Sequence, residues 1–141
     1  MAMKRATLRR QGRKERMTEN ELAKIVVDLC LRIHKILGPG LLESVYEEVL
    51  VYELKKLGLN VLRQVGIAVD YDGIKMDLGF RADILLEDKI IIELKSIEAV
   101  HPVHKKQLLT YLKLAKKKLG LLVNFNVELI KDGITRIANG V

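Results

Sequence analysis

The feature that most constrains the fold is a run of three isoleucines, Ile90–Ile92, followed directly by Glu93, Leu94 and Lys95. A strand without apolar–polar alternation is typical of the centre of a sheet that is covered on both faces. Glu93 and Lys95 are two residues apart, so their side chains point to the same face of such a strand. The segment therefore predicts a buried central strand that carries two charged side chains.

The apolar residues show helical periodicity in the region before this strand and in one segment after it. A first helix is predicted to begin at a capping box formed by Thr18 and Glu21 and to end at Gly38-Pro39-Gly40, because proline cannot continue a helix. A second helix is predicted from about residue 41 to 57, and a third from about 102 to 117, where apolar residues recur at helical spacing.

Between the second and third helices the apolar period changes to two. Apolar and polar residues alternate over 64–71 and again over 74–82, and Asp72-Gly73 between them is a strong signal for a tight hairpin turn. A denser apolar run, Ile84–Leu86, then leads through the turn Glu87–Lys89 to the central strand. This part of the chain predicts three successive strands joined by short turns.

The C-terminal part adds an apolar strand at 119–125 and a final hairpin, in which 127–130 and 134–138 flank Asp132-Gly133. The order of elements is thus helix, helix, three strands, helix and two further strands, without an internal repeat or an interdomain linker. We therefore predict one α/β domain over residues 18–141, with a mixed central β-sheet flanked by helices.

The charge of the chain is concentrated at its start. Residues 1–17 hold seven basic residues and one acidic residue, a sum of +6, whereas the whole chain has a net charge of +7. The remaining residues therefore sum to only +1. We expect residues 1–17 to be a disordered extension; the alternative is an arm that binds the phosphates of nucleic acid.

The cellular setting follows from what the sequence lacks. Cys30 is the only cysteine, which excludes an intramolecular disulfide and a zinc site built on cysteines. No apolar run approaches the roughly 20 residues of a membrane span, and the start of the chain has no apolar core of a secretory signal. We expect a cytoplasmic protein that does not bind membranes.

Asp83 gives the charged end of the central strand a chemical interpretation. If Glu87–Lys89 form a three-residue turn, Asp83 lies opposite Glu93 with their Cβ atoms about 5 Å apart, whereas a two-residue turn would place them on opposite faces. Two facing carboxylates repel, and hard cations such as Mg²⁺ prefer such oxygen ligands. A lysine beside the metal can orient the attacking water and stabilise a phosphorane-like state. The alternative is an ordinary salt pair between Glu93 and Lys95.

Two motifs in this region resemble those of known nucleases. Asp83 followed by Glu93-Leu94-Lys95 resembles the PD-(D/E)xK nuclease signature, with Ala82 in place of the usual proline. Gln107 and Tyr111, which share one helical face, resemble the Q-xxx-Y motif that follows E-x-K in RecB-like nucleases. For this pair alone, a half-buried amphipathic helix is the alternative interpretation.

A third motif extends the resemblance to nearly the whole chain. Residues 40–46 read G-xx-E-xx-Y, and together with the segments 121–126 and 131–134 they make the chain closely similar to the prokaryotic GxxExxY protein family over about residues 19–141. This resemblance implies a single restriction-endonuclease-like PD-(D/E)xK domain. The family is named after a motif, so the resemblance defines the fold better than the substrate.

The resemblance implies a metal-dependent nuclease with Asp83, Glu93 and Lys95 as its catalytic residues. Its Mg²⁺ or Mn²⁺ would be held by Asp83, Glu93 and the backbone carbonyl of Leu94, with Glu43 from an early helix as a further ligand. Lys95 would position the attacking water.

Three further residues are predicted to serve the same cleft. Gln107 and Tyr111 would hold the phosphate backbone or orient the catalytic lysine, and Tyr46 would line or support the cleft. The predicted partner is nucleic acid, with DNA favoured over RNA, and a homodimer or larger complex is left open. The alternatives are a non-catalytic nucleic-acid-binding module and a structural or partner-binding protein that keeps the fold.

Overall fold

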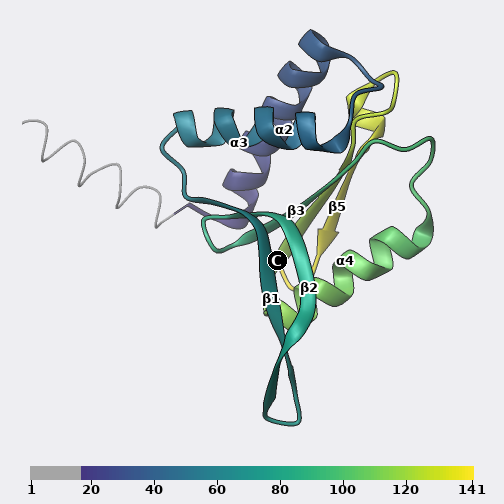
Figure 1. Cartoon of the computed structure of the whole chain (residues 1–141). Coiled ribbons are helices and arrows are strands. Elements are labelled where there is room, and N and C mark those ends of the chain that lie inside the picture. The colour runs from purple at the N-terminus through teal and green to yellow at the C-terminus, as the bar shows by residue number, and fades with distance from the viewer. Residues whose placement is uncertain (1–16) are drawn as a thin grey trace, which may run out of the picture.

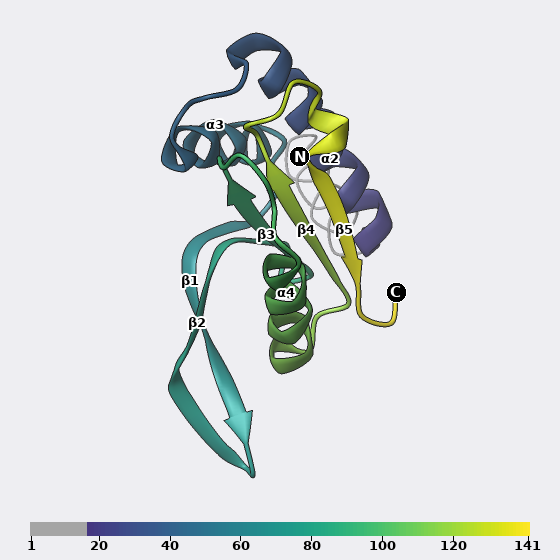
Figure 2. The same ribbon diagram turned by 90° about the vertical axis from the view of Figure 1, so that its right-hand side faces the viewer.

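The computed structural model describes residues 17–141, apart from the side chains of residues 78 and 79 (Figures 1 and 2). The basic extension predicted at residues 1–17 therefore lies outside the described residues, except for Met17. The elements in chain order are α2 (Glu19–Leu37), α3 (Glu43–Lys56), β1 (Val61–Tyr71), β2 (Ile74–Leu86), β3 (Ile90–Lys95), α4 (Pro102–Ala115), β4 (Leu119–Asn124), η1 (Ile130–Asp132) and β5 (Ile134–Ala138).

The strands form one five-stranded mixed sheet in the order β1-β2-β3-β4-β5. Neighbouring strands are antiparallel except β3 and β4, which are parallel and are connected through α4. Helices α2 and α3 cover one face of the sheet, and α4 covers the other (Figures 1 and 2). The predicted fold class, a mixed sheet flanked by helices, is confirmed.

Strand β3 is the central strand that its isoleucines predict. Ile90, Ile92 and Leu94 pack in the apolar cluster beneath α2 and α3, whereas Ile91 packs with Leu108 of α4 on the opposite face. All these side chains are fully or almost fully buried. Because both faces of β3 are covered, the Glu93 side chain at its end is largely removed from solvent.

Local signals in the sequence also match the structure. The Thr18 side chain accepts a hydrogen bond from the backbone N–H of Glu21, which caps the start of α2. Asp72 and Gly73 both have positive φ, 52° and 76°, as a two-residue hairpin turn requires. The β1–β2 hairpin that they close extends well beyond the body of the protein (Figures 1 and 2).

The final hairpin predicted from 127–130 and 134–138 is wrong. Strand β5 pairs with β4, and residues 130–132 form the short helix η1 instead of a strand. The reason lies at Asn124, whose side-chain oxygen accepts hydrogen bonds from the backbone N–H groups of Ile97 and Asn126 and so turns the chain out of β4. The N–H groups of the following loop are then used in local turns.

The β1–β2 ribbon changes the facing of its side chains near Gln64 and Asp83. Ile84 packs beneath α2 and α3, whereas Ala82 and Leu85 pack with the α4 cluster. Regular alternation would put residues 82 and 84 on the same face. The pairing of β1 with β2 skips Gln64 and Asp83, and Gln64 has a φ of 48°. The alternation of the ribbon is therefore broken at these two residues.

No helix within residues 17–141 is long and apolar enough to cross a membrane.

Candidate active site

The turn between β2 and β3 sets the position of Asp83. Leu86 pairs with Ile90, as a three-residue turn requires, and the pairing continues to Ile84 and Ile92. This confirms the predicted register, in which the next residues along the two strands are Asp83 and Glu93. Beyond Ile84 the regular pairing stops, because β2 departs from β3 to form the projecting hairpin.

Asp83 is held by neighbours on both sides. Its Oδ2 accepts a hydrogen bond from the backbone N–H of Leu94 at 2.8 Å, and its Oδ1 accepts one from the Gln64 side chain at 3.3 Å. Its own backbone N–H donates to Oε1 of Glu93 at 3.4 Å. Asp83 thus bridges the first three strands of the sheet.

Glu93 is the most strongly perturbed carboxyl group in the described part of the chain. Burial raises its pKa to about 8, and the adjacent charge of Asp83 adds to the increase, while Lys95 on the same strand opposes it. A carboxyl group with such a pKa is mostly protonated at neutral pH in the absence of a cation. Asp83 and Glu93 therefore form a pair of carboxyls that cannot both ionise without a penalty.

Gln107 and Tyr111 of α4 lie beside this pair. The Gln107 side chain is hydrogen-bonded to Tyr111, and the Tyr111 ring stacks on Phe80 of β2 with 3.6 Å between the ring centroids. Burial raises the pKa of the Tyr111 hydroxyl, and the negative charge of Glu93 raises it further. Tyr111 is therefore within electrostatic range of Glu93.

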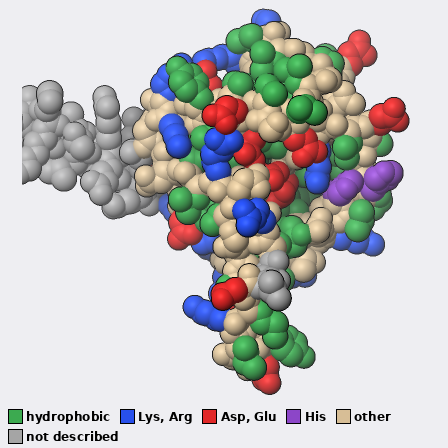
Figure 3. All heavy atoms as spheres, in the orientation of Figure 1, with side chains coloured by type: hydrophobic (Ala, Val, Ile, Leu, Met, Phe, Trp, Pro, Cys, Tyr) green, Lys and Arg blue, Asp and Glu red, His purple; other side chains and the backbone are tan. Residues whose placement is uncertain are grey.

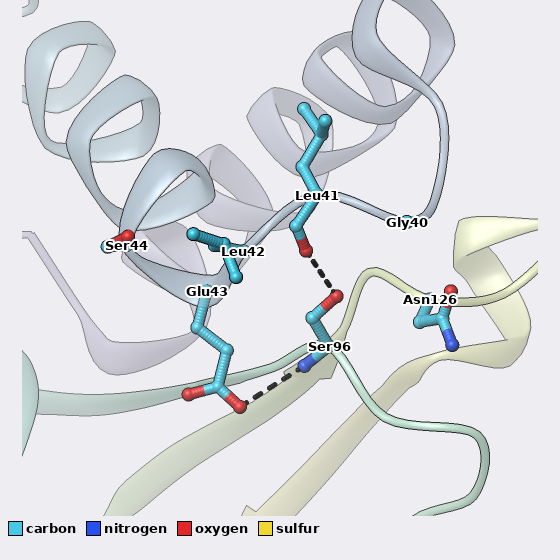
Figure 4. A pocket seen from close by; sticks show the side chains of 7 residues that line it. All are labelled: Gly40, Leu41, Leu42, Glu43, Ser44, Ser96 and Asn126. Atoms are coloured by element: carbon cyan, nitrogen blue, oxygen red, sulfur yellow. Dashed lines mark hydrogen bonds between the residues drawn. The ribbon is translucent and has the colours of Figure 1, made fainter.

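Glu43 lies at the start of α3, next to the loop that follows β3. Its Oε1 accepts a hydrogen bond from the backbone N–H of Ser96 at 3.3 Å, and the Ser96 hydroxyl donates to the Leu41 carbonyl (Figure 4). These residues line a cavity of about 650 Å³. Since Ser96 directly follows Lys95, the cavity adjoins the C-terminal end of β3, where Glu43 contacts Ser96.

Tyr46 supports the loop that precedes α3 from within the core. Its side chain is 0% exposed and stacks on Phe125 with 4.2 Å between ring centroids. Its hydroxyl donates to the Gly38 carbonyl at 2.6 Å and accepts from the Leu41 N–H at 3.1 Å. Tyr46 therefore holds the chain between α2 and α3, which carries part of the cavity wall, and does not itself line the cavity.

Two residues near the carboxyl pair, Gln64 and Glu47, were not expected from the sequence. The Gln64 side-chain nitrogen donates to Oε1 of Glu47 at 2.6 Å as well as to Asp83, and Arg63 donates twice to Oε2 of Glu47. Glu47 is only 7% exposed. The sequence gives no clear signal for Glu47, because the pair Glu47-Glu48 resembles an ordinary solvated helix face. Only the structure shows that Glu47 is buried and faces a charged strand.

Acidic and basic side chains gather on the face of the molecule between α3 and α4 (Figure 3). A pattern of this kind fits a site that binds cations and phosphates together, because a carboxylate pair attracts the cation while lysine balances the phosphate charge.

The comparison with protein families agrees with this geometry. The family described as "PD-(D/E)XK nuclease superfamily" matches residues 20–137, most of the chain. The chain belongs to the PD-(D/E)XK nuclease superfamily. The match contains every residue predicted for the site and excludes the whole basic segment, residues 1–17.

Two solved structures also resemble this superfamily member. One is an alkaline exonuclease (LHK-Exo) from Laribacter hongkongensis, with 17% sequence identity and a TM-score of 0.45, covering 89% of this chain and 73% of that chain. The other is LHK-Exo in complex with dAMP, with 18% identity and a TM-score of 0.45, covering 92% and 75% of the two chains. The search of curated proteins found no match.

The donor atoms of this superfamily member fit a divalent cation only in part. Asp83 and Glu93 offer oxygen atoms from two adjacent carboxyls, the kind of ligand that hard divalent cations prefer, and burial followed by the charge of Asp83 raises the pKa of Glu93. Within residues 17–141, however, no three His, Cys, Asp or Glu side chains form a group that could hold a metal. As folded, the described part of the chain therefore brings together two carboxyl groups at this point and no third side chain of these types.

Proposed function

We propose that the protein is a nuclease that hydrolyses phosphodiester bonds in DNA with the help of Mg²⁺ or Mn²⁺. The observation that carries the proposal is the adjacent Asp83–Glu93 carboxyl pair, with Lys95 two residues further along β3. A binding module or a structural protein has no use for two carboxyls that repel each other in a buried position. We also propose that, within the superfamily, the chain is a member of the GxxExxY family.

The cation would be held by Asp83 and Glu93, and we propose the Leu94 carbonyl as a further ligand. When bound, it would polarise a phosphoryl oxygen and lower the pKa of a bound water. Glu43 is proposed as an additional ligand, but its hydrogen bond to Ser96 must then be exchanged for the cation. Metal titration of Glu43→Gln beside the wild type would test this role separately.

The remaining side chains would act on the phosphate and on charge. The Lys95 ammonium would orient the attacking water and stabilise the negative charge that develops on the phosphoryl oxygens. Gln107 and Tyr111 lie on the α4 side of the carboxyl pair, where their polar groups would hold the substrate backbone or orient Lys95. Tyr46 supports the site indirectly through the loop before α3.

The test is a nuclease assay on single- and double-stranded DNA and on RNA, with Mg²⁺, with Mn²⁺ and with a chelator. We expect metal-dependent cleavage of DNA that is lost in Glu93→Gln and Lys95→Ala. Glu98→Gln and Lys105→Ala serve as matched controls, because both residues are exposed and neither is proposed for the site.

The same assay separates the rival functions when metal binding and nucleic-acid binding are measured beside it. Metal-independent DNA binding by a protein that cleaves no substrate would support a non-catalytic module and overturn the proposal. Cleavage of RNA but not of DNA would keep the reaction and reject the proposed substrate. If the wild type neither binds metal nor nucleic acid, the carboxyl pair and Lys95 belong to an internal ion-pair network.

A further inference from the structure

Gln64 combines two features that are uncommon in a strand. Its φ is 48°, in the left-handed region that non-glycine residues seldom adopt. Its side-chain nitrogen lies 2.6 Å from Oε1 of Glu47 and 3.3 Å from Oδ1 of Asp83. An amide nitrogen carries two hydrogens, so it can donate one to each carboxylate. Strained backbone retained beside a polar cluster is a pointer to function.

The Glu47 end of this bridge is anchored to α3. Glu47 is 7% exposed, and its second oxygen, Oε2, accepts hydrogen bonds from Nε and Nη2 of Arg63 at 3.3 and 3.0 Å. Arg63 is in turn paired with Glu48 through Nη1 at 2.9 Å. With both of its oxygens engaged, the Glu47 carboxylate gives the Gln64 amide a fixed point of attachment.

The Asp83 end of the bridge leaves the carboxylate little freedom. Oδ1 accepts from Gln64 of β1, and Oδ2 accepts from the Leu94 N–H of β3 at 2.8 Å. Each carboxylate oxygen can accept a second hydrogen bond, so a carboxylate held on both oxygens can still interact with a further partner. The Glu93 carboxyl lies within hydrogen-bonding reach of Asp83, which is where a shared ligand would bind.

We propose that Gln64 is a positioning residue that orients the Asp83 carboxylate toward Glu93 by linking it to Glu47 on α3. The inference rests on the proposed function in so far as the shared ligand is a divalent cation. The break in side-chain alternation at Gln64 and Asp83 then brings the Gln64 amide next to the Asp83 carboxylate. Partners that orient a metal ligand typically affect metal affinity or activity by about 10- to 100-fold when they are replaced.

Two variants separate the amide from the backbone. Gln64→Gly removes the amide and also relieves the positive φ, whereas Gln64→Leu removes the amide and keeps the strain. Asp72→Gly is the matched control, because Asp72 has a φ of 52° and lies at the exposed hairpin tip. Mn²⁺ affinity is measured by electron paramagnetic resonance on fully folded protein, and the rate and KM of DNA cleavage are measured beside it.

We expect both Gln64 variants to bind Mn²⁺ at least about tenfold more weakly than the wild type and to lose kcat with little change in KM. Asp72→Gly should match the wild type in every measurement. A purely structural role for Gln64 predicts a lower free energy of unfolding with unchanged Mn²⁺ affinity and unchanged kcat in the folded fraction, and that result would overturn the proposal.

A measurement without metal tests the positioning role of Gln64 independently of the proposed nuclease function. Three-bond NMR couplings report whether the Asp83 side chain occupies one χ1 rotamer. We expect one rotamer in the wild type and averaging among rotamers in both Gln64 variants. If the wild type proves inactive and does not bind Mn²⁺, the nuclease proposal fails while this result still decides the role of Gln64. An Asp83 side chain that stays in one rotamer in both variants refutes the positioning role.

Discussion

Replacing Glu93 with glutamine should stabilise the metal-free protein at pH values above about 4.5, the ordinary pKa of a glutamate. Burial and the charge of Asp83 raise the pKa of Glu93 from 4.5 to about 8 in the folded state. The folded protein therefore binds the proton more tightly than the unfolded chain does. Between these two pKa values, raising the pH removes stability, because ionisation is opposed only in the folded state.

The size of this effect follows from the shift. Each pH unit between the two pKa values lowers the free energy of unfolding by about 1.4 kcal/mol, which gives a loss of about 3 kcal/mol at pH 7 and about 5 kcal/mol above pH 8. Glu93→Gln has no such titration and its amide can still hydrogen-bond Asp83. The difference in unfolding free energy between the variant and the wild type should therefore grow from near zero at pH 4.5 to these values.

The assay is guanidinium unfolding of both proteins at several pH values between 5 and 9, in chelator and then in Mn²⁺. In chelator we expect the variant to be the more stable protein, by a margin that widens with pH. Mn²⁺ at about 100 times its dissociation constant should add roughly 2.7 kcal/mol to the wild type and nothing to the variant. Parallel pH curves would refute the reasoning. A variant that is less stable throughout, with a wild type indifferent to Mn²⁺, would identify a structural ion-pair network.

Three further predictions concern the metal, the core and the start of the chain. Mn²⁺ affinity should fall about tenfold for each pH unit below 8, because protons compete for Glu93; titrations at pH 6, 7 and 8 would measure this, and a flat profile would contradict it. Tyr46→Phe should lower the free energy of unfolding by about 1–3 kcal/mol, because the Gly38 carbonyl and the Leu41 N–H lose a buried partner; denaturant melts would measure it, and an unchanged midpoint would contradict it. Deleting residues 1–16 should leave the unfolding free energy and Mn²⁺ affinity unchanged, whereas a flatter salt dependence of DNA binding would assign phosphate contacts to them.

The carboxyl pair could be predicted from the sequence because turn length determines register. A three-residue turn at Glu87–Lys89 leaves only one pairing of β2 with β3, and that pairing places Asp83 next to Glu93. The spacing of Gln107 and Tyr111 in turn determines the helix face that they share. In both cases the geometry depends on short-range periodicity, which a single sequence contains.

The second half of the site could not be predicted in this way. The left-handed φ of Gln64 is not marked by glycine, asparagine or aspartate, the residues that usually occupy that region. The contact between Gln64 and Glu47 joins a strand to a helix, and its cause is the break in alternation at Asp83. The same limitation explains the final hairpin, because the side-chain hydrogen bonds of Asn124 override the local preference of the segment 127–130.

The carboxyl pair lies at the point where β2 stops pairing with β3 through its backbone and a side chain takes over one of the hydrogen bonds. In a continuous ladder the Leu94 N–H would be satisfied by a carbonyl of β2, but β2 leaves β3 beyond Ile84, and the Asp83 carboxylate accepts that hydrogen bond instead. The residue at the departure point, Asp83, thus places its carboxylate where the backbone ladder would have continued. The projecting hairpin and the carboxyl pair are therefore two consequences of the same break in the sheet.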